Sequence, residues 1–164
     1  NLKGIACMGG YLSPVKVGRR SVGELNLSAD PEASHLVLNA PCPVVLMNAQ
    51  ICLQAPFRWR DYRRLKFWSR NTRAMVRNWL IIHAVFCSIP HFYLWDLLPA
   101  VHISHPELFF PNWVSIQSSV EDLESGSLLS ANIGPDQGVN MPSLIKDFDR
   151  FMELLFEAWK RISV

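Results

Sequence analysis

Residues 23–47, GELNLSADPEASHLVLNAPCPVVLM, contain the pattern that decides the fold. The Asp-Pro-Glu triplet at 30–32 predicts the start of a helix, because an acceptor at the cap, a proline in the first turn and an acid near the positive end of the dipole all stabilise it. The helix is expected to end near Asn39, ahead of two prolines. The apolar run at 43–47 then predicts a strand that is buried on both faces.

The sequence before this stretch supplies another strand. Residues 4–10, GIACMGG, form an apolar run closed by two glycines, which is typical of a buried strand that ends in a loop. Residues 11–23 are expected to form that loop, and residues 24–27 an extended segment. Strand, helix and strand in this order predict an α/β fold with a parallel sheet.

Amphipathic helices are expected between residues 59 and 87, where apolar residues recur at helical spacing opposite a set of arginines. Interleaved arginines and tryptophans also suit nucleic acid. However, the aromatic residues lie on the face opposite the arginines, where they serve the core. A solvated basic face is therefore favoured, and nucleic acid is not expected as a partner. The apolar positions are Trp59, Tyr62, Leu65, Trp68, Met75, Val76, Trp79, Leu80, His83 and Phe86.

Three further elements are expected towards the C-terminus. Residues 94–109 predict a short helix that Asp96 opens and Pro106 closes. Residues 113–120 and 127–133 alternate like paired strands that are joined by a tight turn. An apolar stripe then predicts a final amphipathic helix. The stripe consists of Leu144, Phe148, Met152, Leu155, Trp159 and Ile162.

Composition indicates a folded domain. The chain has 164 residues, of which 49% are hydrophobic and 18% charged, and its net charge of +2 is too small to imply a polyanionic partner. Four cysteines without C-x-x-C spacing favour reduced thiols, and with them a cytoplasmic location. No apolar run is long enough to span a membrane. The chain begins at Asn1, so a preceding segment is expected to be missing.

Glu24 and Asn26 form a candidate binding pair. In an extended segment their side chains point to the same side, so that they present a carboxylate and an amide together. Such a pair suits a polyhydroxyl ligand, because the carboxylate accepts from hydroxyls and the amide both donates and accepts. Short polar pairs are also common in loops, where they cap the next helix. The residues alone favour that second interpretation.

Asp96 is a candidate metal ligand. It lies between Trp95 and two leucines, and a carboxylate that is buried in such a run needs a cation or several donors. Simple helix capping is the alternative. One carboxylate cannot make a calcium site, which needs roughly 6–8 oxygen ligands. The histidines show no H-E-x-x-H spacing, and no Walker loop, G-x-S-x-G elbow or dinucleotide fingerprint is present.

Several separate motifs resemble the nucleoside hydrolase family, the inosine-uridine-preferring N-ribohydrolases. Met-Gly-Gly at 8–10, Glu-Leu-Asn at 24–26 and Asp-Pro-Glu-Ala at 30–33 match family motifs in kind and order. Residues 92–109, FYLWDLLPAVHISHPELF, look like a later family segment in which an aspartate opens a helix. The resemblance covers essentially the whole chain, but only the C-terminal half of a family member.

The resemblance implies a fold and an activity. Residues 1–164 would be the C-terminal part of a single α/β domain, with an open, mostly parallel, Rossmann-like sheet, flanking helices and a small β-hairpin, incomplete at the N-terminus. The reaction would be hydrolysis of the N-glycosidic bond of ribonucleosides. The expected partners are a ribonucleoside and either further copies of the chain or the missing N-terminal half.

The resemblance also assigns roles to residues. Met8, Glu24 and Asn26 would bind the ribose, and Asp96 would be a calcium ligand. Trp95 stands where many members have a histidine acid; members with tryptophan there form chiefly a purine-preferring group, in which stacking on the base replaces the acid. The catalytic role of Trp95 would therefore be stacking, with purines preferred.

The chain departs from the family pattern in ways that matter for catalysis. Gln50 and Cys52 replace an aspartate and a threonine, and Arg19 stands near the place of a ribose-binding asparagine. The N-terminal D-x-D-x-x-x-D-D cluster, which supplies most calcium ligands and the general base, is absent. Calcium would bind only if these aspartates came from elsewhere. Two hypotheses remain open: part of a nucleoside hydrolase, or a non-catalytic interaction module with the same fold.

Overall fold

The computed structural model describes residues 2–135 and 137–162, and its centre is a five-stranded sheet. The two strands predicted from sequence, β1 (Ile5–Met8) and β4 (Val44–Met47), pair in parallel, so that Met8 lies beside Met47. Helix α1 (Pro31–Leu38) connects them, and the Asp30 carboxylate caps it by accepting from the Ala33 N–H at 2.9 Å. The predicted α/β class is therefore confirmed.

The remainder of the sheet is antiparallel. Strand β10 (Val139–Asn140) continues the sheet in parallel with β4, and β8 (Trp113–Ile116) and β9 (Ser130–Asn132) follow antiparallel, in the order β1-β4-β10-β8-β9. The predicted pairing of β8 with β9 is confirmed, but the tight turn between them is wrong. A short helix, α6 (Val120–Glu124), fills the connection, because Ser119 and Asp122 form a reciprocal capping box.

The segment between β1 and α1 also differs from the prediction. Residues 11–23, expected as a loop, contain a hairpin of β2 (Val15–Val17) and β3 (Arg20–Val22). Residues 24–27 form no strand. The reason is the Glu24 side chain, which accepts hydrogen bonds from the backbone N–H groups of residues 26–28 and so bends the chain.

The helical region 59–87 is broken into several pieces. These are α3 (Trp59–Tyr62), a 3₁₀ turn η1 (Leu65–Phe67), α4 (Arg70–Ile82) and a π-helical turn η2 (His83–Cys87). Two short strands that the sequence analysis missed, β5 (Pro56–Arg58) and β6 (His91–Tyr93), pair antiparallel on either side of this region. Leu65 and Leu80 are buried as expected, but Met75, Trp79 and Phe86 are 72%, 51% and 59% exposed.

The basic face formed by the arginines between residues 59 and 87 is not fully solvated. The Arg64 guanidinium lies 3.8 Å from the ring centroid of Phe156, and that of Arg73 lies 5.6 Å from Tyr62. Both cations therefore cover aromatic rings as well as facing water.

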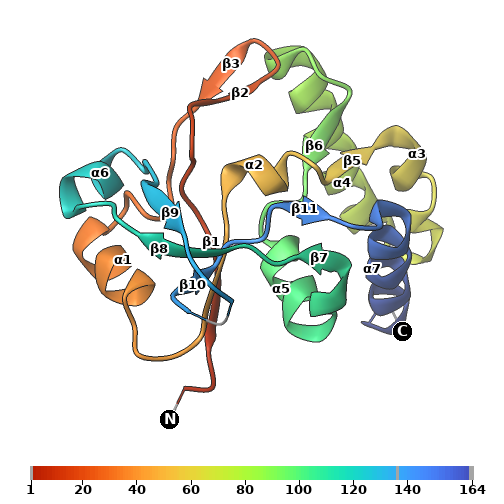
Figure 1. Cartoon of the computed structure of the whole chain (residues 1–164). Coiled ribbons are helices and arrows are strands. Elements are labelled where there is room, and N and C mark those ends of the chain that lie inside the picture. Colours follow the sequence, from red (N-terminus) through yellow and green to blue (C-terminus); the bar gives the residue numbers. More distant parts are fainter. Residues whose placement is uncertain (1, 136, 163–164) are drawn as a thin grey trace.

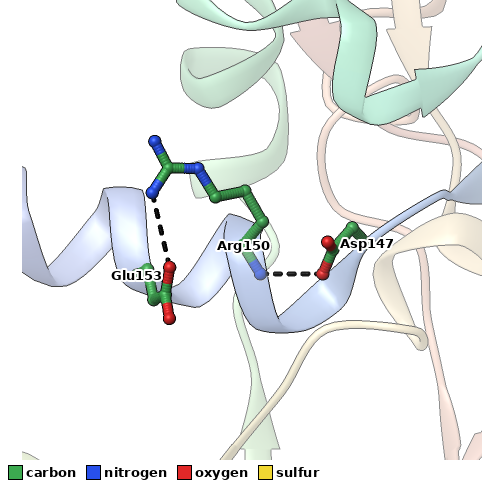
Figure 2. A network of polar contacts seen from close by, with 3 residues as sticks. All are labelled: Asp147, Arg150 and Glu153. Atoms are coloured by element: carbon green, nitrogen blue, oxygen red, sulfur yellow. Dashed lines mark hydrogen bonds and ion pairs between the residues drawn. The ribbon is translucent and has the colours of Figure 1, made fainter.

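The C-terminal part confirms the two predicted helices with changed boundaries. Helix α5 (Leu97–Ser104) is followed by η3 (Pro106–Leu108) and β7 (Phe109–Phe110), which pairs with β11 (Leu144–Ile145). Leu144 thus lies in a strand and not in the final helix. Helix α7 (Phe148–Ile162) begins where Asp147 accepts from the Arg150 N–H, and Arg150 also pairs with Glu153 at 3.3 Å (Figure 2).

Two apolar cores lie on opposite faces of the sheet. Because side chains alternate along a strand, Val44 and Leu46 pack against α1 and α6, whereas Met47 belongs to the larger core with α5 and α7. Figure 1 shows these two pairs of helices on opposite sides of the sheet. Across the described ranges, 2–135 and 137–162, no helix is long and apolar enough to cross a membrane.

Candidate functional site

The candidate site is a pocket of about 240 Å³ at the carboxyl ends of β1 and β4. Open α/β sheets bind ligands at this edge. All five side chains named from the sequence, Met8, Glu24, Asn26, Trp95 and Asp96, line this one pocket. They come from the end of β1, from the bend after the hairpin and from the turn before α5, so that the fold joins residues up to 88 positions apart.

Glu24 is held by four backbone donors. Its Oε1 accepts from the N–H groups of Gly10, Asn26 and Leu27 at 3.2, 2.9 and 3.0 Å. Its Oε2 accepts from the Ser28 N–H at 2.7 Å. Burial by itself would raise the pKa of Glu24, but the four hydrogen bonds outweigh it and the pKa lies below its ordinary value. The carboxylate is therefore charged at neutral pH, and Oε2 keeps room for another donor.

The neighbouring loop after α6 fixes the position of this carboxylate. Gly126 lies against the Glu24 side chain with φ of +78°, and a Cβ atom there would be only 2.3 Å from the Cβ of Glu24. A larger residue at 126 would thus displace Glu24 as well as strain the backbone.

Asn26 is oriented by Met8. Its Nδ2 donates to the Met8 carbonyl oxygen at 3.1 Å and contacts the Met8 sulfur at 3.0 Å. This arrangement uses the donor end of the amide within the protein and leaves Oδ1 as an acceptor. Oδ1 of Asn26 and Oε2 of Glu24 therefore both suit ligand hydroxyl groups.

Asp96 does not cap the helix that it precedes. No capping hydrogen bond reaches its side chain, and the residue is exposed, whereas the sequence had suggested a buried carboxylate. Beneath it the Cys52 thiol is buried and lies 3.8 Å from the Trp95 carbonyl oxygen. Burial, together with the charge of Asp96, raises the pKa of Cys52 to about 12. Cys52 is thus a packed, protonated thiol at neutral pH. Asp96 is a carboxylate of the pocket lining that makes no helix-capping bond.

The residues that the structure describes do not make a metal site by themselves. Within the part of the chain that the structure describes, no group of three or more His, Cys, Asp or Glu side chains is close enough to hold an ion. Glu24 and Asp96 are the two carboxylates among the described lining residues, and Glu24 is already bonded to four N–H groups. A calcium shell needs roughly 6–8 oxygens. The donor set does not fit calcium unless other ligands join it.

Five apolar side chains of the pocket were not predicted from the sequence. Tyr11, Val15, Val22, Leu25 and Ala49 also line it. Val15 and Val17, which alternate with Lys16 just before Gly18, were the available signal for a hairpin. Together these side chains give the pocket an apolar wall beside its polar one.

Comparisons with known proteins identify the family and the fold. The family model described as inosine-uridine preferring nucleoside hydrolase matches residues 1–152. No curated protein sequence matches the chain significantly. A purine-preferring ribonucleoside hydrolase from Gardnerella vaginalis shares the fold with a TM-score of 0.78 and 18% identity, over 98% of this chain and 52% of that one.

Two further solved structures are similar. A plant nucleoside hydrolase gives a TM-score of 0.72 at 19% identity, over 91% of this chain and 51% of that one. An inosine-uridine preferring nucleoside hydrolase from Bacillus anthracis gives 0.63 at 19% identity, over 96% and 50%. At such identities the likeness concerns the fold alone. The chain spans about half the length of each of these structures.

Proposed function

Since the chain belongs to the inosine-uridine preferring nucleoside hydrolase family, we propose that it supplies the substrate pocket for hydrolysis of the N-glycosidic bond of ribonucleosides. On this proposal, residues 1–164 are the C-terminal part of a single nucleoside-hydrolase-like domain. The observation that carries the proposal is the division of the pocket into an acceptor-rich wall and an apolar wall. A ribonucleoside has the same division, between a sugar with hydroxyl groups and a flat, largely apolar base.

Each wall has a defined task in this proposal. Oε2 of Glu24 and Oδ1 of Asn26 accept hydrogen bonds from ribose hydroxyls, with Met8 beneath the sugar. Trp95 stacks on the base. Cleavage of an N-glycosidic bond develops positive charge on the sugar, as in other oxocarbenium-like transition states. The ionised Glu24 interacts with that charge more strongly in the transition state than in the ground state, which is what accelerates a reaction.

The remaining catalytic groups have to come from outside this pocket. Neither wall contains a carboxylate that is free to act as a general base except Asp96, which the proposal assigns to calcium. Asp96 would supply one ligand of a calcium site that aspartates of another segment complete. We propose the missing N-terminal half, or a further copy of the chain, as that partner. β1 lies at the edge of the sheet, where another strand can pair (Figure 1).

The second candidate is a non-catalytic interaction module with the same fold. Its support is the absence of any three-residue metal group among residues 2–135 and 137–162. For either candidate we propose a cytoplasmic location, which the four free cysteines support.

Titration of the ¹⁵N-labelled chain with inosine tests the binding part of the proposal. We expect inosine to shift the Asn26 side-chain amide and the Ser28 backbone amide, both of which lie at the acceptor wall. Asn26→Ala should weaken binding about tenfold, because the ribose loses one acceptor. The matched control is Asn39→Ala, which removes an amide that bonds the end of α1 instead. Unperturbed pocket amides at millimolar inosine would refute the proposal.

Co-expression tests catalysis separately. The chain together with the N-terminal half of a family relative should release ribose from inosine in a calcium-dependent manner. Formation of a stable complex that binds inosine but releases no ribose would favour the non-catalytic module.

A further inference from the structure

The β2–β3 hairpin contributes two valines to the apolar wall of the pocket. Val15 on β2 and Val22 on β3 are direct partners in the antiparallel pair, so their side chains share one face of the hairpin. Both line the pocket, and Val22 remains 37% exposed there. The polar side chains of the pocket come from other segments. Whatever fixes the hairpin therefore fixes this valine pair in the apolar wall.

Gln50 fixes the base of the hairpin. Its Oε1 accepts from the Leu12 N–H at 2.9 Å, and its Nε2 donates to the Ser13 carbonyl oxygen at 2.8 Å. One side chain thus bonds two successive backbone groups, as a neighbouring strand would. Gln50 is itself held on α2 (Ala49–Cys52), a helix that Asn48 caps directly after β4.

A second contact fixes the tip. The Arg19 N–H donates to the Cys87 carbonyl oxygen at 3.2 Å, and the Arg20 Nε donates to that of Phe86 at 2.9 Å. Gly18 has a φ of +60°, and a Cβ atom there would lie 1.7 Å from the Cys87 oxygen. Only glycine allows the hairpin tip to approach the end of η2 this closely.

The hairpin also rests on Trp95. Val15, Val17 and Ala49 form a small buried cluster, and the partly buried rings of Tyr93 and Trp95 pack against it. The two rings are edge-to-face, with centroids 5.7 Å apart. Movement of the hairpin would therefore change the environment of the Trp95 indole.

We propose that this hairpin is the specificity-determining wall for the base, and that Gln50 is the positioning residue that sets its distance from Trp95. The inference rests on the proposed function, because it identifies the base as the group between the valine pair and the indole. The wall selects by ring size and not by hydrogen bonds to the base edge. Its apolar side chains offer no donors, and the nearby Tyr11 hydroxyl already donates to the Ser125 carbonyl oxygen at 2.8 Å.

The test compares Gln50→Ala with a matched control, Gln54→Ala. Gln54 makes the same pair of backbone bonds, to Ser143 and Ile145, but at β11 and away from the pocket. Both variants lose one bond accepted from a backbone N–H and one donated to a backbone carbonyl oxygen, and Gln50 also loses a longer contact of 3.3 Å to the Ser13 hydroxyl. A general loss of stability therefore affects both variants. Only Gln50→Ala should accelerate hydrogen exchange of the Leu12 and Arg19 amides and shift the Trp95 indole N–H resonance.

Binding of inosine, uridine and ribose completes the experiment. Gln50→Ala should raise the Kd for inosine about tenfold, a change of the size expected for impaired base stacking, and leave that for ribose within about twofold. Val22→Phe narrows the space between the hairpin and the Trp95 indole and leaves Gln50 unchanged. It should weaken the binding of inosine more than the binding of uridine.

The outcomes separate the two proposals. A wild-type chain that binds none of the three probes refutes the proposed function and the specificity role with it. Wild-type binding followed by equal losses of inosine and ribose affinity in Gln50→Ala overturns the specificity role alone. Unchanged exchange of the hairpin amides in that variant overturns the positioning role of Gln50.

Discussion

Replacement of Glu24 by glutamine is the sharpest test of how the pocket is built. The wild-type carboxylate accepts from four backbone N–H groups, three at Oε1 and one at Oε2. Glutamine can keep the three bonds at its single oxygen, but its amino group then faces the Ser28 N–H, which is the shortest of the four contacts. The variant exchanges four charge-assisted bonds for three neutral bonds and one pair of opposed donors.

The expected loss of stability follows from these exchanges. Hydrogen bonds to charged groups contribute about 1.5–3 kcal/mol each and neutral ones about 1 kcal/mol, while an unpaired buried N–H costs about 1–3 kcal/mol. Because Glu24 is only half-buried, water replaces part of what is lost. We therefore expect a net destabilisation of about 2 kcal/mol. For a chain of this length that corresponds to a fall in Tm of about 4–8 °C.

Urea unfolding followed by circular dichroism, at a series of pH values, measures this loss. The pKa of Glu24 is lower in the folded than in the unfolded chain, so its contribution is fully present above the unfolded pKa and disappears as pH falls through the folded pKa. Glutamine does not titrate, so the difference in unfolding free energy between wild type and variant should become smaller over that acid range. Glu157→Gln, an exposed change on α7, should leave stability within about 0.5 kcal/mol. Equal stability at pH 7, or a gap that persists at acid pH, would refute the hydrogen-bond account.

Four further outcomes are expected. Arg64→Gln should lower the unfolding free energy by about 1 kcal/mol more than Arg63→Gln, because only Arg64 stacks on an aromatic ring; equal effects in urea melts would contradict this. Cys52 should be alkylated last of the four cysteines in the native chain, as its burial and a thiol pKa of about 12 require, and mass spectrometry would show the order. The isolated chain should release no ribose from inosine, uridine, adenosine or guanosine, and calcium-dependent release would overturn that expectation. In a catalytically complete assembly, Trp95→Ala should reduce turnover of inosine more than that of uridine, and equal losses would exclude base stacking as its role.

The parts of the fold that local signals specify were predictable from sequence. Asp30 and the following proline define the start of α1 through contacts within four residues, and the burial of β4 on both faces follows from its apolar composition. The order of strand, helix and strand then required a parallel pair. These elements need no information from distant parts of the chain.

The elements that were not predicted correctly from the sequence depend on partners that are distant along the chain. The β2–β3 hairpin is fixed by Gln50 and by the carbonyl groups at 86–87, up to 68 positions away. Segments β5 and β6 pair across 32 intervening residues, and no periodicity within three-residue strands can reveal such a pair. The exposed Met75, Trp79 and Phe86 follow a helical spacing that looks like a core face, and only the tertiary structure shows that other side chains fill the core.

The five residues named from the sequence line one pocket, but the sequence could not show which hydrogen bonds their side chains make, and this changes what each residue indicates. Glu24 bends the chain through four N–H groups, and Asn26 ties that bend to Met8, so both have structural tasks that a non-catalytic chain would also need. Their presence alone therefore does not distinguish an enzyme from a binding module. Asp96 differs from both residues, because it makes no helix-capping bond and is exposed at the pocket wall, so we expect its replacement to change ligand or cation binding without a loss of stability.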